Sequence, residues 1–402
     1  MREGWEKKTL GELCTVITKG TTPTSVGHSF IDEGINFVKI ESISLDGKFL
    51  PHKFAHISEE AHIALKRSQL QEGDILFSIA GALGRTALVT NEILPANTNQ
   101  ALSIIRLKDE SIISKEYLLS ALSTGFTLEQ VEKFKGGVAQ LNLSLTQMKS
   151  FEIPISSLKE QKQIVTTLDK AFKQIDQVKA NLEKNLNNAK ELFQSKLNEV
   201  FSQRGEGWEE KSFNEICKIT SKLIDPKEEE YQDLLHIGAG NIESEKGILN
   251  NLKTAKEENL ISGKFLFDAE MVLYSKIRPY LMKVVKCDFV GLCSADIYPL
   301  VPEKKEITQS FLYYLLLSNN FTEYAIKGSA RAGMPKVNRK HLFDYRCYLP
   351  NIEKQDELSK ILDIIFEESL KLQTHYQQKL NNLEELKKSI LQKAFKGELD
   401  YA

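Results

Sequence analysis

Two long stretches of the chain carry apolar side chains at alternating steps of three and four residues. The first runs from Leu158 to Phe201 without a proline or glycine, and its apolar stripe is broken once, at Lys179. This spacing puts the apolar side chains on one narrow face of a helix. The stripe includes Leu168, Phe172, Leu182 and Leu186. The pattern predicts a single helix of ~44 residues, which at 1.5 Å per residue is ~65 Å long.

The second stretch, from Ile352 to Phe395, repeats this pattern. Its stripe includes Leu362, Phe366, Leu380 and Leu383. Each stripe is too narrow to be buried in a globular core and too apolar to be left in water, so we expect the two helices to pack on each other. Antiparallel packing is expected to place a globular segment at each end of the pair, related by a pseudo-twofold axis.

The segments before the two helices have a different character. Short β-branched and apolar runs such as NFVKI and GDILFSI alternate with turn signals such as GTTP and DGKF. This pattern is typical of an α+β fold. We therefore divide the chain into a first head (residues 1–156), a first long helix (157–204), a second head (205–350) and a second long helix (351–402).

The two halves are an internal repeat. The only tryptophans, Trp5 and Trp208, stand in similar runs, GWEKKTLGELCTV and GWEEKSFNEICKI, at an offset of 203 positions. Matching segments follow in the same order, including GGVAQLN with AGMPKVN at an offset of 196. The openings of the long helices match at an offset of 194. A period near 200 indicates a duplicated head with its helix rather than a solenoid.

Composition and charge narrow the function. The 41% hydrophobic and 27% charged residues are typical of a folded protein, and the net charge of −2 gives no global attraction to nucleic acid. Five cysteines without metal-ligand spacing indicate reduced thiols. The charged N-terminus and the shortness of the densest apolar run, residues 311–317, predict a cytoplasmic protein without a membrane span.

Catalytic and metal-binding motifs are not found in the sequence. There is no P-loop, no GxSxG, no HExxH and no motif of an amino-methyltransferase. The seven histidines are scattered, and we predict no metal site. The chain is therefore expected not to be an enzyme by itself.

Local basic and amide-rich segments are the remaining signal. Basic side chains without acids between them, and loops rich in hydroxyl and amide groups, suit phosphates and base edges, although a solvated surface explains any one of them equally well. The candidate DNA-binding residues are Lys19, Thr21, Thr22, Arg85, Asn97, Gln100, Lys276, Arg278, Arg331, Lys336, Arg339 and Lys340.

These features together resemble the specificity subunits of type I restriction-modification systems. The resemblance rests on GTTPT, EGDILFS, the GGVAQLN stretch leading to IPI, LKEQKQI at the start of the helix, and the ending LQKAFKGEL. No single block is decisive, but the ordered set occurs twice and covers essentially the whole chain. The resemblance implies two target-recognition domains, each reading one half of a bipartite DNA sequence, with paired antiparallel helices that set the gap.

The resemblance also implies partners and cofactors. Two modification subunits that methylate adenine, and restriction subunits, would assemble on the helices. S-adenosylmethionine, and ATP with Mg in a restriction complex, would be bound by those partners and not by this chain. The residues expected in the coiled coil and the partner-docking surface are Gln161, Leu168, Phe172, Leu182, Leu186, Gln355, Leu362, Phe366, Leu380 and Leu383.

Differences between the two heads predict an asymmetric target. AEMVLYSKIRPY stands where the first head has EGDILFSIAGALGR, and GTTP has no counterpart after Gly207. The competing hypothesis is a non-catalytic scaffold whose two heads bind proteins. The sequence does not reveal the DNA target, the gap length or the bases that each residue contacts.

Overall fold

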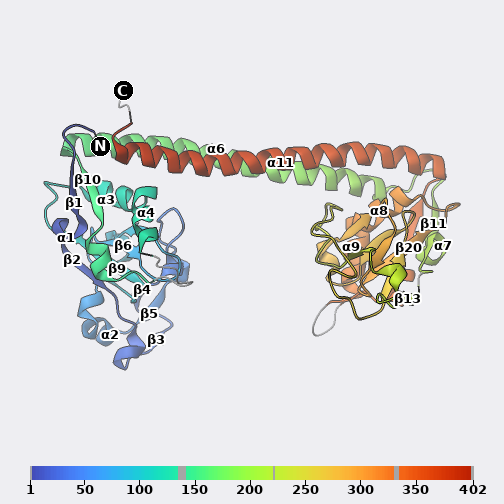
Figure 1. Cartoon of the computed structure of the whole chain (residues 1–402), viewed down its shortest axis with the longest axis horizontal. Coiled ribbons are helices and arrows are strands. Elements are labelled where there is room, and N and C mark those ends of the chain that lie inside the picture. The colour runs from blue at the N-terminus through green and yellow to red at the C-terminus, as the bar shows by residue number, and fades with distance from the viewer. Residues whose placement is uncertain (1, 135–141, 221, 330–334, 400–402) are drawn as a thin grey trace. The chain divides into compact units, whose positions relative to one another are not determined.

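The computed structural model describes residues 2–134, 142–220, 222–329 and 335–399, and these form two compact units. The first unit consists of residues 1–181 and 380–402, and the second of residues 182–379. Each unit therefore contains one head and parts of both long helices (Figure 1). The two units are described separately.

The first unit has two four-stranded sheets and a short two-stranded ladder. The ladder pairs β1 (Glu6–Thr9) with β10 (Glu152–Ile155), and the sheets have the orders β2-β9-β6-β7 and β3-β5-β4-β8. Their strands are β2 (Cys14–Lys19), β3 (Phe30–Ile31), β4 (Ile35–Val38), β5 (Ala55–Ile57), β6 (Ile75–Ser78), β7 (Thr86–Leu88), β8 (Ala96–Thr98) and β9 (Leu102–Leu107). The helices are α1 (Leu10–Leu13), α2 (Glu59–Ala64), α3 (Lys115–Leu122), α4 (Gly125–Lys133) and α5 (Leu145–Lys149).

The second unit repeats this plan with one longer sheet. The ladder pairs β11 (Glu209–Ser212) with β21 (Arg346–Leu349), and the sheets have the orders β12-β20-β17-β18 and β13-β16-β19-β14-β15. Their strands are β12 (Cys217–Lys218), β13 (Leu223–Ile224), β14 (Leu235–Ile237), β15 (Lys253–Thr254), β16 (Lys264–Phe267), β17 (Val272–Ser275), β18 (Val284–Lys286), β19 (Gly291–Cys293) and β20 (Ile297–Pro302). The helices are α7 (Phe213–Ile216), α8 (Gln309–Leu317), α9 (Asn319–Lys327) and α10 (Arg339–Phe343).

The repeat and the α+β class predicted for each head are confirmed, but one predicted match is wrong. The sequence comparison matched Asn142 with Asn338. In the structure the Leu143 N–H donates to the Ile79 carbonyl, and the Val337 N–H donates to the Lys276 carbonyl in the same way, so Leu143 is equivalent to Val337. Ser144 and Asn338 then cap α5 and α10. The offset in this region is therefore 194, not 196. Most of GGVAQLN, residues 136–141, and residues 332–334 of the matching segment lie outside the described residues.

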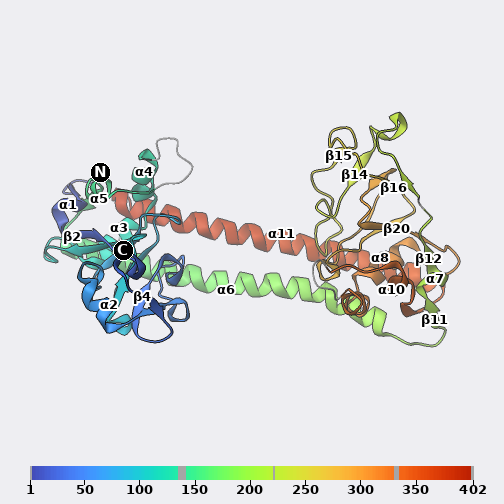
Figure 2. The same ribbon diagram turned by 90° about the horizontal axis from the view of Figure 1, so that it is seen from below.

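The two long helices extend as predicted, α6 over Leu158–Ser202 and α11 over Ile352–Lys396. In the first unit the beginning of α6 packs against the end of α11, and Lys179 forms an ion pair with Glu384 at 2.8 Å. In the second unit the Phe193 and Phe366 rings lie 4.7 Å apart, and Ser369 Oγ donates to the Ala189 carbonyl at 2.6 Å. Residue numbers fall along one helix as they rise along the other, so the antiparallel pairing is confirmed (Figure 2). How the heads are placed relative to each other stays a prediction.

Most of the residues predicted for the coiled coil lie on its packed face. Leu168 and Leu362 are fully buried, Leu182 is nearly so, and the others are half-buried, namely Phe172, Leu186, Phe366, Leu380 and Leu383. Leu168, Phe172, Leu362 and Phe366 belong to the hydrophobic cores of the units. Their contribution to a partner surface stays a prediction.

Gln161 and Gln355 are corrections to the predicted coiled-coil and docking set. Both side chains are fully buried at the start of a long helix, where they bind the helix to its own head. Gln161 accepts from the Ser114 N–H at 3.0 Å and donates to the carbonyls of Ile112 and Ser156. A buried amide that forms three hydrogen bonds inside one unit is not available to a partner. Both glutamines therefore attach a long helix to the head of the same unit.

The largest hydrophobic cluster of each head combines sheet residues with a short helix, α3 or α8, and with both long helices. In the second head the whole run from Phe311 to Leu317 is buried as part of α8, which explains the densest apolar segment of the sequence. Among the described residues, no helix combines the length and the apolar character that crossing a bilayer requires.

Candidate nucleic-acid interface

The second head gathers cations from two separate segments around a carboxylate from a third. Lys276 follows β17, Asp296 precedes the neighbouring β20, and Lys336 pairs with Ile277 through an isolated β-bridge. Lys336 Nζ lies 2.9 Å from Asp296 Oδ1, and Lys276 Nζ lies 3.8 Å from the same oxygen. The sheet register thus brings together residues that are 60 positions apart in the sequence.

An aromatic ring supports these cations. Lys276 Nζ lies 5.1 Å and Arg339 Cζ 5.9 Å from the centroid of the Tyr298 ring, and the Tyr298 hydroxyl donates to the Val337 carbonyl at 3.0 Å. Burial, and after it the charge of Lys336, lowers the pKa of Lys276. We call Lys276, Asp296, Tyr298, Lys336 and Arg339 the basic cluster.

The remaining predicted residues of the second head lie next to this cluster. Arg278 is exposed, its backbone N–H donates to the Pro335 carbonyl at 2.9 Å, and its φ of 50° is in the left-handed region that a non-glycine residue rarely adopts. Lys340 is exposed on α10, and Arg331 lies outside the described residues. The structure therefore brings Lys276, Lys336 and Arg339 together, with Arg278 close by along the backbone.

The first head presents a different polar surface, in which hydroxyl and amide groups predominate. The Thr21 N–H donates to the Thr98 carbonyl at 3.1 Å, and a Cβ on Gly20 would stand 2.1 Å from that oxygen, so this close approach requires glycine. The Thr22 hydroxyl donates to the Gln100 side-chain carbonyl. Lys19 and Gln100 are exposed, so these predicted residues form one accessible loop surface.

Arg67 joins this surface and was missed by the sequence analysis. Its guanidinium donates to the Thr21 hydroxyl at 3.2 Å, from a position 46 residues along the chain. The only signal for it in the sequence is that two basic residues, Lys66 and Arg67, are adjacent. Arg67 gives the first head an exposed cation beside its hydroxyl groups.

Two predicted DNA-binding residues of the first head, Asn97 and Arg85, form contacts within the head instead. Asn97 is fully buried; its Nδ2 donates to the Leu65 carbonyl and to Ser68, and its Oδ1 contacts His62. It occupies the place of the buried Leu292 in the second head. A base cannot reach a side chain enclosed in this way.

Arg85 serves the fold in the same manner. Its guanidinium donates to the carbonyls of Ile43 at 3.0 Å and Ile40 at 3.4 Å. Lys283 takes its place in the second head and donates to the Ala239 carbonyl at 2.5 Å. A cation at this position joins the residue before β7 or β18 to the loop after β4 or β14, so this side chain serves the fold of its head.

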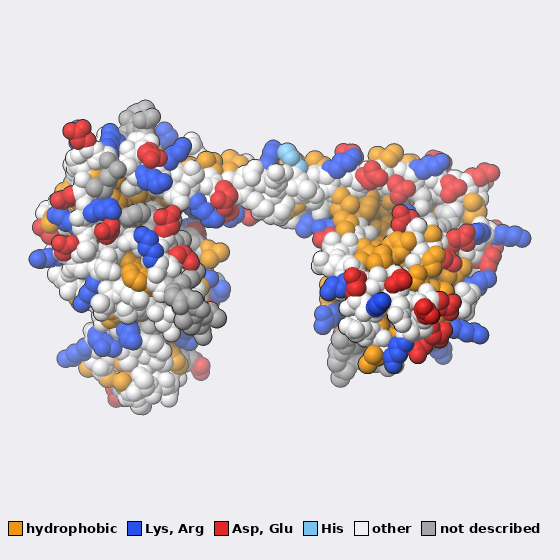
Figure 3. Space-filling view, viewed as in Figure 1, with side chains coloured by type: hydrophobic (Ala, Val, Ile, Leu, Met, Phe, Trp, Pro, Cys, Tyr) orange, Lys and Arg blue, Asp and Glu red, His pale blue; other side chains and the backbone are white. Residues whose placement is uncertain are grey.

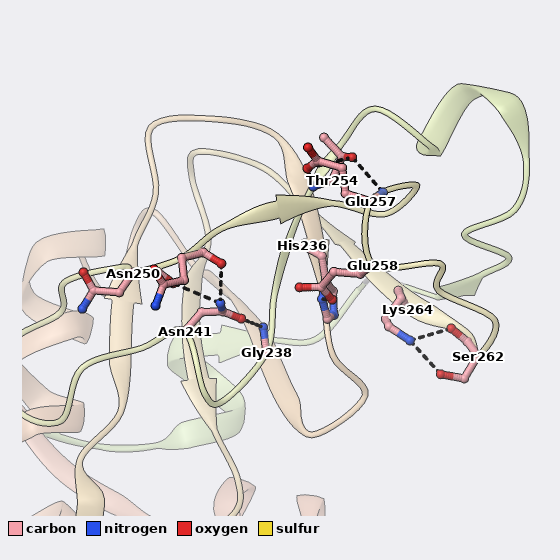
Figure 4. Close-up of polar contacts among 10 residues, drawn as sticks. His236, Gly238, Asn241, Asn250, Thr254, Glu257, Glu258, Ser262 and Lys264 are labelled. Atoms are coloured by element: carbon pink, nitrogen blue, oxygen red, sulfur yellow. Dashed lines mark hydrogen bonds and ion pairs between the residues drawn. The ribbon is translucent and has the colours of Figure 1, made fainter. Parts of the chain in front are cut away.

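A second polar group of the second head surrounds His236 on β14 (Figure 4). His236 Nδ1 lies 2.7 Å from Glu258 Oε2, and Lys264 Nζ donates to the hydroxyl and carbonyl of Ser262 at 2.7 Å. His236 Nε2 is buried without a hydrogen-bond partner among the described residues. Burial lowers the pKa of His236 below 6.5, outweighing Glu258, which raises it; Lys264 lowers it further.

This depressed pKa predicts acid sensitivity of the second unit. The folded state binds fewer protons at His236 than the unfolded state, so stability is lost as the pH falls through 6.5 toward the folded pKa. Between pH 7.5 and 5.5 we expect the melting temperature of the second unit to fall more in the wild type than in the His236→Phe variant. Phenylalanine is chosen because Phe37 stands at the equivalent position of the first head. Trp208 fluorescence in a Trp5→Phe background measures the melting temperature. If the melting temperatures of the wild type and the variant depended equally on pH, His236 would not be the source of the acid sensitivity.

Catalytic groups do not emerge from the described part of the chain. No three His, Cys, Asp or Glu side chains there are placed to hold a metal ion. Burial raises the pKa of Cys14, Cys287 and Cys347 to about 12, so these thiols stay protonated and are poor nucleophiles. On the face drawn in Figure 3, Lys and Arg side chains are interspersed with Asp and Glu over both units, so positive charge gathers only locally.

Known proteins resemble this chain in sequence. The family model described as type I restriction modification DNA specificity domain matches residues 2–188 and again residues 205–382. The chain is 34% identical over 192 residues to the type I restriction enzyme EcoDI specificity subunit of Escherichia coli, covering 48% of this chain and 42% of that protein. It is 20% identical over 418 residues to the StySPI specificity subunit of Salmonella potsdam, covering 99% and 89%. The EcoDI alignment thus spans less than half of that relative's length.

Solved structures share the fold. A chain from work on complex assembly and conformational transition of the type I R-M system is 20% identical, with 99% of each chain covered and a TM-score of 0.80. The HsdS subunit from Thermoanaerobacter tengcongensis is also 20% identical, with 99% of this chain and 98% of that chain covered and a TM-score of 0.57.

Proposed function

Because the chain belongs to the type I restriction-modification DNA specificity family, we propose that it is a DNA-specificity subunit that reads a bipartite, asymmetric target. One observation carries the proposal: the two heads share a fold but present different polar groups on their surfaces. The second head presents the basic cluster, and the first presents Thr21, Thr22, Gln100 and Arg67. Two similar folds with different reading surfaces suit two different half-sites.

The chemistry of recognition follows from these groups. Lys336 and Arg339 suit phosphates and guanine edges, whereas the hydroxyls of Thr21 and Thr22 and the amide of Gln100 suit phosphates and adenine edges. The net charge of −2 requires partner subunits to supply much of the phosphate contact. The family match, to a DNA specificity domain in each half of the chain, favours DNA reading over the scaffold hypothesis.

Partners complete the proposed activity. Two modification subunits that bind S-adenosylmethionine would methylate adenine at N6, and restriction subunits using ATP and Mg would cut DNA. Methylation of a base inside a duplex requires its extrusion, so the modification subunits need a duplex held in register. Holding that duplex in register is the proposed role of this chain, in the cytoplasm and without chemistry of its own.

Methylation mapping tests the proposal. We expect co-expression of this chain with its modification subunit, in a host that lacks adenine methylation, to produce N6-methyladenine in one split, asymmetric motif. Single-molecule sequencing of the host genome reads out both half-sites and their gap. The motif should vanish when this chain is omitted. A complex that forms and methylates without a split motif would refute the proposed role.

A further inference from the structure

A comparison of the two heads shows which features of the basic cluster the fold requires and which are found in the second head alone. In the second head the Lys276 N–H donates to the Asp296 carbonyl at 3.0 Å, and the Val337 N–H donates to the Lys276 carbonyl at 2.8 Å. In the first head the same two bonds join Ile79 to Ala101 and Leu143 to Ile79, both at 2.9 Å. The same corner of the fold therefore forms without any charged side chain.

The corresponding positions confirm that the charges are additions. Lys276, Asp296, Lys336 and Arg339 of the second head correspond to Ile79, Ala101, Asn142 and Leu145 of the first. The aromatic support Tyr298 corresponds to Ser103. A group of three cations and one carboxylate that the fold does not require is best explained by a ligand.

Asp296 occupies the place that an anionic ligand would take. Its carboxylate lies between Lys336, at 2.9 Å, and Lys276, at 3.8 Å. The Asp296 side chain is 41% exposed and that of Lys336 is 49% exposed, so their ion pair contributes little to stability and can open. A phosphate that accepts hydrogen bonds from the same N–H groups of Lys336 takes the place of this carboxylate.

Once displaced from the lysines, the Asp296 carboxylate is free to accept a hydrogen bond from a base in a DNA groove. Asp and Glu accept from exocyclic amino groups, above all cytosine N4, and thereby distinguish bases. Non-specific DNA offers phosphates but not an amino group at the required position. The cost of displacing Asp296 is then recovered only on the correct half-site.

We propose that Asp296 is a specificity-determining residue of the second head, with two alternating partners. Without DNA, or on non-specific DNA, it competes with phosphate for Lys336 and Lys276. On the target, phosphate takes the lysines and Asp296 accepts a hydrogen bond from a base amino group. This inference rests on the proposed function and adds the residue that suppresses non-specific binding.

Asp296→Asn tests this exchange in the complex assembled with its modification subunits. The probes are a duplex with the mapped target and a scrambled duplex of equal length, titrated over a series of KCl concentrations by fluorescence anisotropy. We expect the variant to bind the scrambled duplex several-fold more tightly, with a salt slope steeper by about one, and the target more weakly. The ratio of the two affinities should fall at least about tenfold.

Asp288→Asn is the matched control. It removes one exposed carboxylate from the same head, after β18, and thus changes the net charge equally away from the cluster. It should shift both duplexes alike and keep the ratio. Lys336→Gln should reduce the salt slope by about one on the target duplex and by less on the scrambled duplex, where Asp296 competes with phosphate for this lysine.

The outcomes separate the two proposals. A wild-type complex that does not distinguish the target from the scrambled duplex would refute the proposed function itself. A wild-type complex that does distinguish them, together with an Asp296→Asn complex that keeps the wild-type ratio, would refute the role of Asp296 alone. Unchanged melting temperature of Asp296→Asn establishes that a changed ratio is not a folding defect.

Discussion

Removal of one heptad from each long helix is expected to shorten the gap between the two methylated half-sites by about three base pairs. The deletion takes residues 182–188 from α6 and residues 371–377 from α11. These segments face each other, because Ala189 contacts Ser369 and Phe193 contacts Phe366 just beyond them. Seven helical residues span ~10.5 Å, and B-DNA rises ~3.4 Å per base pair.

The heptad is the appropriate unit because it preserves the packing. Seven residues are close to two helical turns, so the stripe continues across the junction with a rotation of only ~20°. Deletion from one helix alone would leave the stripes out of register and mix a packing defect with a length change. The paired deletion therefore alters the spacer while each head keeps its own fastening to the helices.

Methylation mapping of the co-expressed variant gives the new gap directly. A length-preserving control changes Glu183 and Lys184, both exposed on α6, to Ala and should keep the wild-type gap. If the paired deletion also kept the wild-type gap with intact half-sites, the paired helices would not set the spacing. If methylation were lost altogether, binding of the modification subunits to the shortened complex would show whether docking or spacing had failed.

The long helices were predictable because their signal is local and repeated. Each contains a stripe of apolar positions at steps of three and four, with proline before and glycine after. The predicted ends at Phe201 and Phe395 differ from the observed ends by one residue each. The α+β character of the heads followed from short runs between turn signals. Sheet order did not, because pairs such as β4 with β8 join segments about 60 residues apart.

The candidate site was only partly predictable, because exposure is decided by tertiary packing. Asn97 and Arg85 have the side chains of DNA-binding residues, yet the fold encloses the one and engages the other with backbone carbonyls. Lys276, Lys336 and Arg339 were found as basic residues, but the carboxylate between them, Asp296, drew no attention. A lone acid has no sequence signal until the sheet places it beside cations.

Gln355→Leu is expected to lower the free energy of unfolding of the second unit by about 3 kcal/mol or more. Gln355 is fully buried, accepts from the Thr308 N–H at 3.0 Å, and donates to the carbonyls of Glu306 at 2.8 Å and Pro350 at 2.9 Å. Leucine fills similar volume but leaves these three backbone groups unpaired. Each unpaired buried polar group costs about 1–3 kcal/mol.

The two tryptophans make this measurement specific to one unit. Trp5 belongs to the first unit and Trp208 to the second, so urea unfolding followed by fluorescence in a Trp5→Phe background reports on the second unit. Gln378→Leu, at an exposed position of the same helix, is the matched control and should change the free energy by less than about 0.5 kcal/mol.

The first unit offers an independent repetition of the experiment. Gln161→Leu removes the corresponding contacts with Ser114, Ile112 and Ser156, and Trp208→Phe isolates the Trp5 signal. We expect a loss of similar size there, with the second unit unaffected. If both Leu variants unfolded like the wild type, the buried amides would not fasten the helices to the heads. The presence of glutamine at both positions would then need an explanation other than stability.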